Sequence, residues 1–170
     1  AELELELVRN GYPQKFWLKL GAEPVMMNGR RHLCVAMEDV TEPKLAEGKV
    51  ALNARRTQTL LQLNQMREAG LKETTDFALE EAVRLTQSTI GYLAFLNEDE
   101  SVLTMHSWSK SAMAECAIID KPIIYPVVTT GLWGEAVRQR RPVFTNDYAA
   151  ANPLKKGYPQ GHVAVKRHMN

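Results

Sequence analysis

The spacing of hydrophobic and polar residues predicts an antiparallel meander at the start of the chain. Residues 2–8 alternate between acidic and apolar side chains, the period of a strand with one buried face. Two more strands are predicted over 15–27 and 31–40, and the Asn-Gly pairs at 10–11 and 28–29 are typical of tight hairpin turns. The first strand's inward residues are Leu3, Leu5 and Leu7. This face needs cover, which we expect from the following helix, a second chain or residues outside the sequence.

A long helix is predicted next, over residues 43–68, which hold a single glycine and no proline after the first position. Apolar residues recur along it at roughly helical spacing: Leu45, Leu52, Leu60, Leu63 and Met66. Thr59 and Lys49 lie near this stripe. The stripe favours pairing with a second copy of the helix in a dimer; the alternative is that it covers the following domain.

After Ala69-Gly70 the chain alternates between helical and strand patterns. Thr75 is a candidate N-cap for a helix over 76–86. The further predicted elements are strands at 90–96 and 102–108, a short helix at 111–116, a strand at 123–128, a helix at 131–140 and a strand at 143–144. The pattern as a whole predicts an α+β fold.

Composition limits the classes of partner. The chain is 45% hydrophobic and 24% charged with a net charge of +1, which gives no electrostatic case for nucleic acid or an anionic membrane. It has no run of about eighteen apolar residues and no basic, then apolar leader. The sequence begins Ala-Glu, inside a strand pattern, so we expect a piece of a longer cytoplasmic protein.

The two cysteines, Cys34 and Cys116, are too few for a disulfide framework and form no CxxC metal motif. Both fall in apolar stretches, so we expect small buried side chains in a reducing compartment. GxSxG, GxxxxGK and HExxH are all absent from the sequence, so the residues predict no enzymatic activity.

The sequence from Asp39 to Lys44, DVTEPK, resembles the hinge that closes PAS domains and starts their output helix. Thr41 is the candidate N-cap of that helix. The resemblance implies that residues 1–41 are the last three strands of a PAS domain, without the earlier elements that form most of its cofactor pocket. Residues 42–69 would then be a connecting signalling helix.

The segment from Gly131 to Asp147, GLWGEAVRQRRPVFTND, contains a glycine pair, an amphipathic helix, a basic turn, Pro142, an apolar strand and a closing Asp. It resembles the segment that forms the wall and mouth of a GAF domain's ligand pocket. With the order of elements before it, the resemblance implies that residues 70–170 are a GAF domain lacking its last strands and helix. The expected architecture is a PAS-tail meander, a long helix and an incomplete GAF-like antiparallel sheet flanked by helices.

The GAF resemblance implies a set of ligand-binding residues, which are Tyr92, Trp108, Cys116, Tyr125, Trp133 and Asp147. The four aromatic side chains combine a large apolar body with one polar group, which suits a small-molecule pocket, although they could equally be core. Some GAF photoreceptors attach a bilin where Cys116 stands, but Ala117 replaces their adjacent histidine. A redox role of Cys116 is the other alternative.

Several other polar residues have two interpretations. His106, His162 and His168 could hold a haem or metal or be structural, and their spacing matches no zinc pattern. Lys155-Lys156 and Lys166-Arg167 could form a lip that faces an anion, or solvated surface.

These features favour a sensory fragment of a signal-transduction protein such as a sensor histidine kinase. We expect it to bind an unidentified small molecule without a resident cofactor or catalytic residues, and to relay binding through a homodimeric helix, with no nucleic-acid or membrane contact. The alternatives are a GAF-fold methionine sulfoxide reductase and a ligandless dimerisation module. The reductase needs a nucleophilic and a resolving cysteine, and Cys116 alone falls in the GAF-like part.

Overall fold

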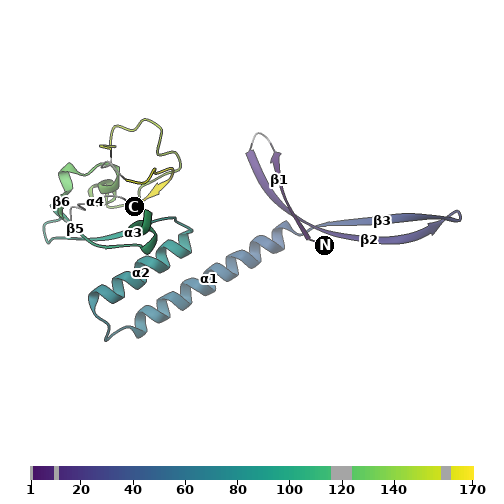
Figure 1. Ribbon diagram of the computed structural model, residues 1–170, viewed down its shortest axis with the longest axis horizontal. Helices are drawn as coiled ribbons and strands as arrows, with labels where there is room; N and C mark the ends of the chain where they lie inside the picture. Colours follow the sequence, from purple (N-terminus) through teal and green to yellow (C-terminus); the bar gives the residue numbers. More distant parts are fainter. Residues whose placement is uncertain (1, 10–11, 116–123, 158–161) are drawn as a thin grey trace. The chain divides into compact units, whose positions relative to one another are not determined.

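The computed structural model describes residues 2–9, 12–115, 124–157 and 162–170. The chain forms two compact units, the first ending at Gln58 and the second beginning at Thr59. The described residues form helices and antiparallel sheets ordered β1-β2-β3, β4-β5-β6 and β7-β8, so the predicted α+β class is confirmed (Figure 1).

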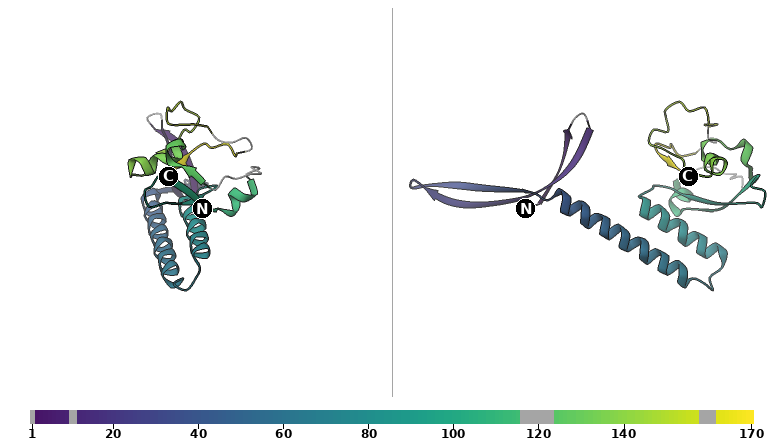
Figure 2. Two further views of the ribbon diagram at one scale, coloured as in Figure 1. Left: turned by 90° about the vertical axis from the view of Figure 1, so that its left-hand side faces the viewer. Right: turned by 180° about the vertical axis from the view of Figure 1, so that it is seen from behind.

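The first unit contains the predicted meander. Its strands are β1 (Glu2–Arg9), β2 (Tyr12–Met27) and β3 (Arg30–Asp39). β1 pairs with the first half of β2 and β3 with the second half, as the right-hand view in Figure 2 shows. The β2–β3 turn has positive φ at Asn28 (50°) and Gly29 (72°), the geometry that an Asn-Gly hairpin favours. The 10–11 turn lies outside the described residues.

The alternating pattern builds a sheet with one apolar face. Directly opposed residues share a face, and the apolar pairs are Leu3–Leu18, Leu5–Phe16, Leu20–Met37, Ala22–Val35 and Pro24–Leu33. This face is open on β3, because Leu33, Val35 and Met37 are 66%, 56% and 71% exposed. On β1, Leu3 is also exposed, at 44%. The described chain therefore does not provide the cover that we expected for this part of the sheet.

The hinge after β3 uses its polar side chains differently from the prediction. The Thr41 hydroxyl accepts a hydrogen bond from the Trp17 N–H at 3.0 Å, so it ties the helix start to β2 and does not cap the helix. The Asp39 carboxylate instead accepts the Thr41 N–H at 2.9 Å. The prediction of Thr41 as N-cap is therefore wrong, because a strand N–H competes for the same hydroxyl.

The long helix α1 (Thr41–Gln65) is slightly shorter than predicted. The predicted apolar stripe is not uniform, because Leu60 is 66% exposed while Leu52 and Leu63 are half-buried. Thr59 is buried, and its hydroxyl donates to the Glu81 carboxylate at 2.9 Å. The last turns of α1 therefore cover part of the second unit.

In the second unit, helix α2 (Leu71–Thr86) packs against a sheet whose central strand is β5 (Figure 1). Its strands are β4 (Tyr92–Leu96), β5 (Val102–Trp108) and β6 (Ile124–Pro126), followed by the two-residue pair β7 (Phe144–Thr145) and β8 (His168–Met169). Its shorter helical elements are α3 (Lys110–Glu115), the 3₁₀ turns η1 (Val127–Thr129) and η2 (Leu132–Gly134), and α4 (Glu135–Gln139). The predicted helix over 131–140 is thus a 3₁₀ turn followed by a short α-helix.

Thr75 does not start α2. The helix begins after Gly70, and the Thr75 hydroxyl donates back to the Leu71 carbonyl at 2.9 Å, inside the first turns. The buried apolar residues of the unit are Leu79, Leu103, Ala112, Val127 and Leu132. This core joins α2, β5 and the turns that lead into α4, which are the elements that position the candidate site.

The cysteines differ from expectation where they can be compared. Cys34 is exposed on β3, opposite Glu23, so the prediction that it is buried is wrong. It lies on the face that alternates with the apolar one, which the apolar composition of the stretch did not reveal. Cys116 lies outside the described residues. No helix among the described residues has the length and hydrophobicity needed to span a bilayer.

Candidate functional site

A pocket of about 260 Å³, open to solvent, lies in the second unit, where β6 and the turns η1 and η2 meet the loop before residue 158. Its lining residues are Tyr125, Thr129, Thr130, Gly131, Trp133, Lys156 and Gly157. Its volume lies just below the usual range of ligand pockets, so it suits a small ligand. Among the predicted site residues, Tyr125 and Trp133 line it.

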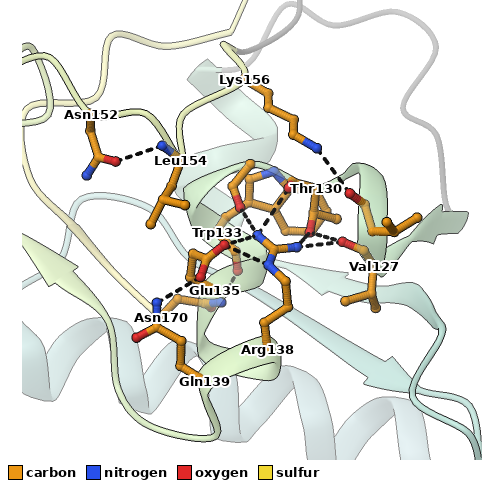
Figure 3. Close-up of polar contacts among 12 residues, drawn as sticks. Val127, Thr130, Trp133, Glu135, Arg138, Gln139, Asn152, Leu154, Lys156 and Asn170 are labelled. Carbon is orange, nitrogen blue, oxygen red and sulfur yellow. Dashed lines mark hydrogen bonds and ion pairs between the residues drawn. The ribbon is translucent and has the colours of Figure 1, made fainter.

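The aromatic side of the pocket is built around Trp133. Its ring makes edge contacts with Tyr125 and Tyr92, at centroid distances of 5.1 and 6.2 Å. Tyr92 lies behind Trp133, and its hydroxyl donates to the Asn170 side-chain oxygen at 2.9 Å. The Asn170 amide in turn donates to the Trp133 carbonyl (Figure 3). Burial raises the pKa of Tyr92, so this hydroxyl stays a neutral donor.

The two glycines of the predicted motif are both sites of close approach. A Cβ on Gly134 would lie 1.7 Å from the Thr130 hydroxyl oxygen, and one on Gly131 would lie 2.9 Å from the Lys156 backbone nitrogen. Only glycine therefore fits at position 134 without a shift of Thr130. Gly131 has the same role toward the 154–156 loop, which brings Lys156 to the pocket.

Arg138 fixes the turn that lines the pocket. Its guanidinium donates to the carbonyls of Val127, Thr130 and Gly131, at 2.6, 3.2 and 2.8 Å (Figure 3). It also donates to the Glu135 carboxylate at 2.6 Å. Arg138 therefore holds three peptide groups of this turn in place.

Glu135 is the buried acid of this network, at 6% exposure. Gln139 donates to its second oxygen at 2.8 Å. The hydrogen bonds from Gln139 and from Arg138 hold the pKa of Glu135 below its usual range, so the carboxylate is ionised and fully paired. Sequence reasoning missed this residue, although its spacing to Arg138 and Gln139 on a helix signals such bonds.

The first two lysines of the predicted lip, Lys155 and Lys156, have different roles. Lys156 lines the pocket, and its ammonium donates to the Val128 carbonyl at 3.0 Å. Lys155 turns away: its ammonium donates to the Tyr148 carbonyl at 2.5 Å and lies 5.1 Å from the Tyr148 ring centroid. One lysine therefore faces the pocket while the other holds the loop together.

Trp108 is paired with Tyr92 across β4 and β5, but it is absent from the described lining of the Trp133 pocket. It lines a second depression, also of about 260 Å³, with Phe77, Lys110 and polar residues of α2. Beneath this depression the buried Ser107 donates to the Asp76 carboxylate at 2.6 Å, and Lys72 donates to the same group at 2.6 Å. Within the described residues, Trp108 makes no ring contact with Trp133 or Tyr125.

Asp147 is exposed and caps a turn. One of its carboxylate oxygens accepts the N–H groups of Ala149 and Ala150, at 3.0 and 3.2 Å. It is absent from the described pocket lining, so its contacts are those of a turn cap and not of a ligand-binding residue. Cys116, the remaining predicted site residue, lies outside the described residues. The lining residues that the sequence did not single out are Thr129, Thr130 and Gly157.

The histidines do not assemble into a metal site in the described part of the chain, where no group of three His, Cys, Asp or Glu side chains could hold an ion. His106 stacks edge-on with Phe95 at 5.0 Å, and His168 lies 5.8 Å from the Tyr148 ring. Burial lowers the pKa of His168, so it is a neutral packed side chain.

Comparison with known proteins identifies the family. Residues 68–170 match the sequence profile of the GAF domain. The chain is also 56% identical over 153 residues to the methyl sulfide methyltransferase-associated sensor of Methanosarcina acetivorans. That alignment covers 90% of this chain and 15% of the relative, so the chain spans about one seventh of that protein. No solved structure matches the chain. By the extent of the profile match and the order of its elements, the chain belongs to the GAF domain family.

Proposed function

We propose that the chain is a sensory module that binds a small molecule between Trp133, Tyr125 and Lys156. The observation that carries the proposal is the aromatic-walled pocket of about 260 Å³ on the turn that Gly131 and Gly134 allow to pack closely. A rigid, paired network around Arg138 keeps that turn in one geometry, and such preorganisation favours binding of a specific ligand. The similarity to a protein named as a sensor supports a sensory role.

We propose further that the signal passes through α1 in a homodimer. Apolar side chains that remain exposed on this helix support the idea: Leu45, Val50, Leu60 and Leu61 are 49%, 69%, 66% and 57% exposed. Such residues at a dimer seam would be removed from water. In this proposal, ligand occupancy changes the packing or register of the paired helices, which is a shift between two arrangements.

The wider context of the module is also a proposal. The hinge bonds among Asp39, Thr41 and Trp17 suit a rigid junction between a sheet and an output helix, which supports the resemblance of residues 1–41 to the end of a PAS domain. The rest of such a domain would cover the open apolar face of β3. A cytoplasmic sensor histidine kinase is the parent protein that we propose, with binding and relay, not catalysis, as the role of this fragment.

Native mass spectrometry tests the ligand proposal. The wild-type chain, incubated with a small-molecule extract of its source cells, should carry a non-covalent adduct. Trp133→Ala should lose the adduct because the central wall of the pocket is gone. Trp108→Ala is the matched control, since it removes the same ring from the separate depression and should keep the adduct.

Absence of an adduct on the folded wild type, or equal retention by Trp133→Ala, would contradict the proposal. The reductase alternative is tested alongside by thiol-dependent turnover of methionine sulfoxide, for which we expect no activity.

A further inference from the structure

The lining of the Trp133 pocket has an uneven distribution of charge, and this bears on which ligands it takes. Lys156 supplies the one charged side chain among the described lining residues. Its ammonium has three N–H donors, and the Val128 carbonyl at 3.0 Å accepts one of them. Two donors therefore remain for a ligand beside the aromatic wall.

The two threonine hydroxyls of the lining are already engaged as donors. Thr129 donates to the Pro126 carbonyl at 2.8 Å, and Thr130 donates to the Val127 carbonyl at 2.6 Å. Thr130 also accepts a hydrogen bond from Arg138 at 2.8 Å. Neither threonine is available to donate without breaking a bond of the fold. The remaining side-chain donors of the described lining are the Lys156 ammonium, the Tyr125 hydroxyl and the Trp133 indole N–H, and of these Lys156 alone is charged.

The backbone adds a donor through Arg138. The guanidinium holds the Thr130 carbonyl, and in a trans peptide the next N–H points the opposite way, so the Gly131 N–H faces away from Arg138. That N–H donates to no acceptor among the described residues. Gly131 lies against the Lys156 backbone, and both residues line the same pocket.

The nearest acid does not cancel this positive character. Lys156 is close enough to Glu135 to influence its ionisation. The Glu135 carboxylate, however, is buried and held by Arg138 and Gln139, and it is absent from the described lining. The paired Glu135–Arg138 unit is neutral as a whole, and Lys156 gives the described lining a net positive charge.

We infer that the pocket selects a small organic anion, whose acidic group lies against the Lys156 ammonium and the Gly131 N–H while its apolar body packs on Trp133 and Tyr125. This inference rests on the proposed sensory pocket and names the class of its ligand. Charge-assisted hydrogen bonds give the acidic group its place, and the aromatic edges give affinity to a flat or apolar body.

Benzoate and benzamide are the probes, because they share a ring and differ in charge. Their binding is followed by the amide signal of Gly131 and the indole signal of Trp133 in ¹H–¹⁵N NMR titrations. We expect benzoate to bind about fivefold more tightly than benzamide, the effect of one partly exposed ion pair with an added backbone bond. The preference should shrink at high salt, since salt screens an exposed charge.

Lys156→Met keeps the apolar stem and removes the charge, so it should lose the preference for benzoate. Lys166→Met, at an exposed lysine outside the described lining, is the matched control and should keep it. Because the salt dependence is measured on the wild type, the test does not depend on the folding of Lys156→Met.

The outcomes separate the inference from the proposed function. Equal binding of the two probes, or a preference that survives in Lys156→Met, would overturn the anion inference and leave a small-molecule pocket in place. Failure of both probes to move the Gly131 and Trp133 signals would also overturn the inference. The proposed function is tested by a different measurement. It fails when the folded wild type carries no adduct, or when Trp133→Ala retains the adduct as well as the wild type does.

Discussion

Gly134 offers the sharpest test of how the pocket turn is packed. Its φ of −93° and ψ of −2° are accessible to alanine, so a Gly134→Ala substitution imposes no backbone strain of its own. The cost comes from contact, because the new Cβ would lie 1.7 Å from the Thr130 hydroxyl oxygen and 2.7 Å from the Thr130 Cβ. The Thr130 backbone must therefore move.

The magnitude follows from three terms. Overpacking costs about 1–3 kcal/mol, and displacement of the Thr130 hydroxyl from Val127 and Arg138 adds about 1–3 kcal/mol. Replacing glycine with alanine returns up to about 1 kcal/mol through the unfolded chain. We expect a net destabilisation of about 2–4 kcal/mol in urea unfolding followed by circular dichroism and tryptophan fluorescence.

Two further variants isolate the contact. Thr130→Gly removes both clashing atoms, so in combination with Gly134→Ala it should cost less than the sum of the single changes. Gly48→Ala in α1 is the control, because a Cβ there meets nothing within 4 Å, and it should stabilise by up to about 1 kcal/mol. A neutral or stabilising Gly134→Ala would refute the packing argument.

Three further predictions concern Glu135, Asp147 and α1. The hydrogen bonds from Gln139 and Arg138 hold the pKa of Glu135 in the folded chain below its ordinary value of 4.5, so the stabilisation from this carboxylate is present above that pH and is lost as pH falls through the lowered pKa. Acid unfolding of Glu135→Gln should therefore show a shallower decline in stability below about pH 4.5 than the wild type, and identical slopes would contradict this. Asp147→Ala should lower stability by about 1 kcal/mol through loss of the turn cap while leaving benzoate binding unchanged, and a loss of binding would return Asp147 to the pocket. Val50→Glu with Leu61→Glu should convert the proposed dimer to monomers in sedimentation, whereas a monomeric wild type at micromolar concentration would exclude pairing through α1.

The sequence predicted those features that follow from periodicity and turn chemistry. Strand alternation gave the meander and the exact bounds of β5, and the Asn28-Gly29 pair gave a hairpin turn. The predictions of helix N-caps were less accurate, because the hydroxyls of Thr41 and Thr75 have other partners in the folded chain.

The sequence predicted only part of the candidate site, because the rest depends on contacts that form in the folded chain. The glycine motif pointed to Trp133, but Lys156 reaches the pocket through a loop whose path no spacing rule fixes. Trp108 is the last residue of β5, and the β4–β5 register shifts between Leu93 and Ala94. Alternation cannot locate such an irregularity, so it could not show that Trp108 lines a different depression.

Hydrogen–deuterium exchange of the ligand-bound chain tests the central claim, that occupancy of the Trp133 pocket is felt by α1. The chain that carries its adduct is compared with the same chain after unfolding and refolding in ligand-free buffer. The account predicts slower exchange with ligand across 124–134 and a change in exchange across α1 (Thr41–Gln65). Exchange in α1 that is identical with and without ligand, while 124–134 is protected, would contradict a sensory relay.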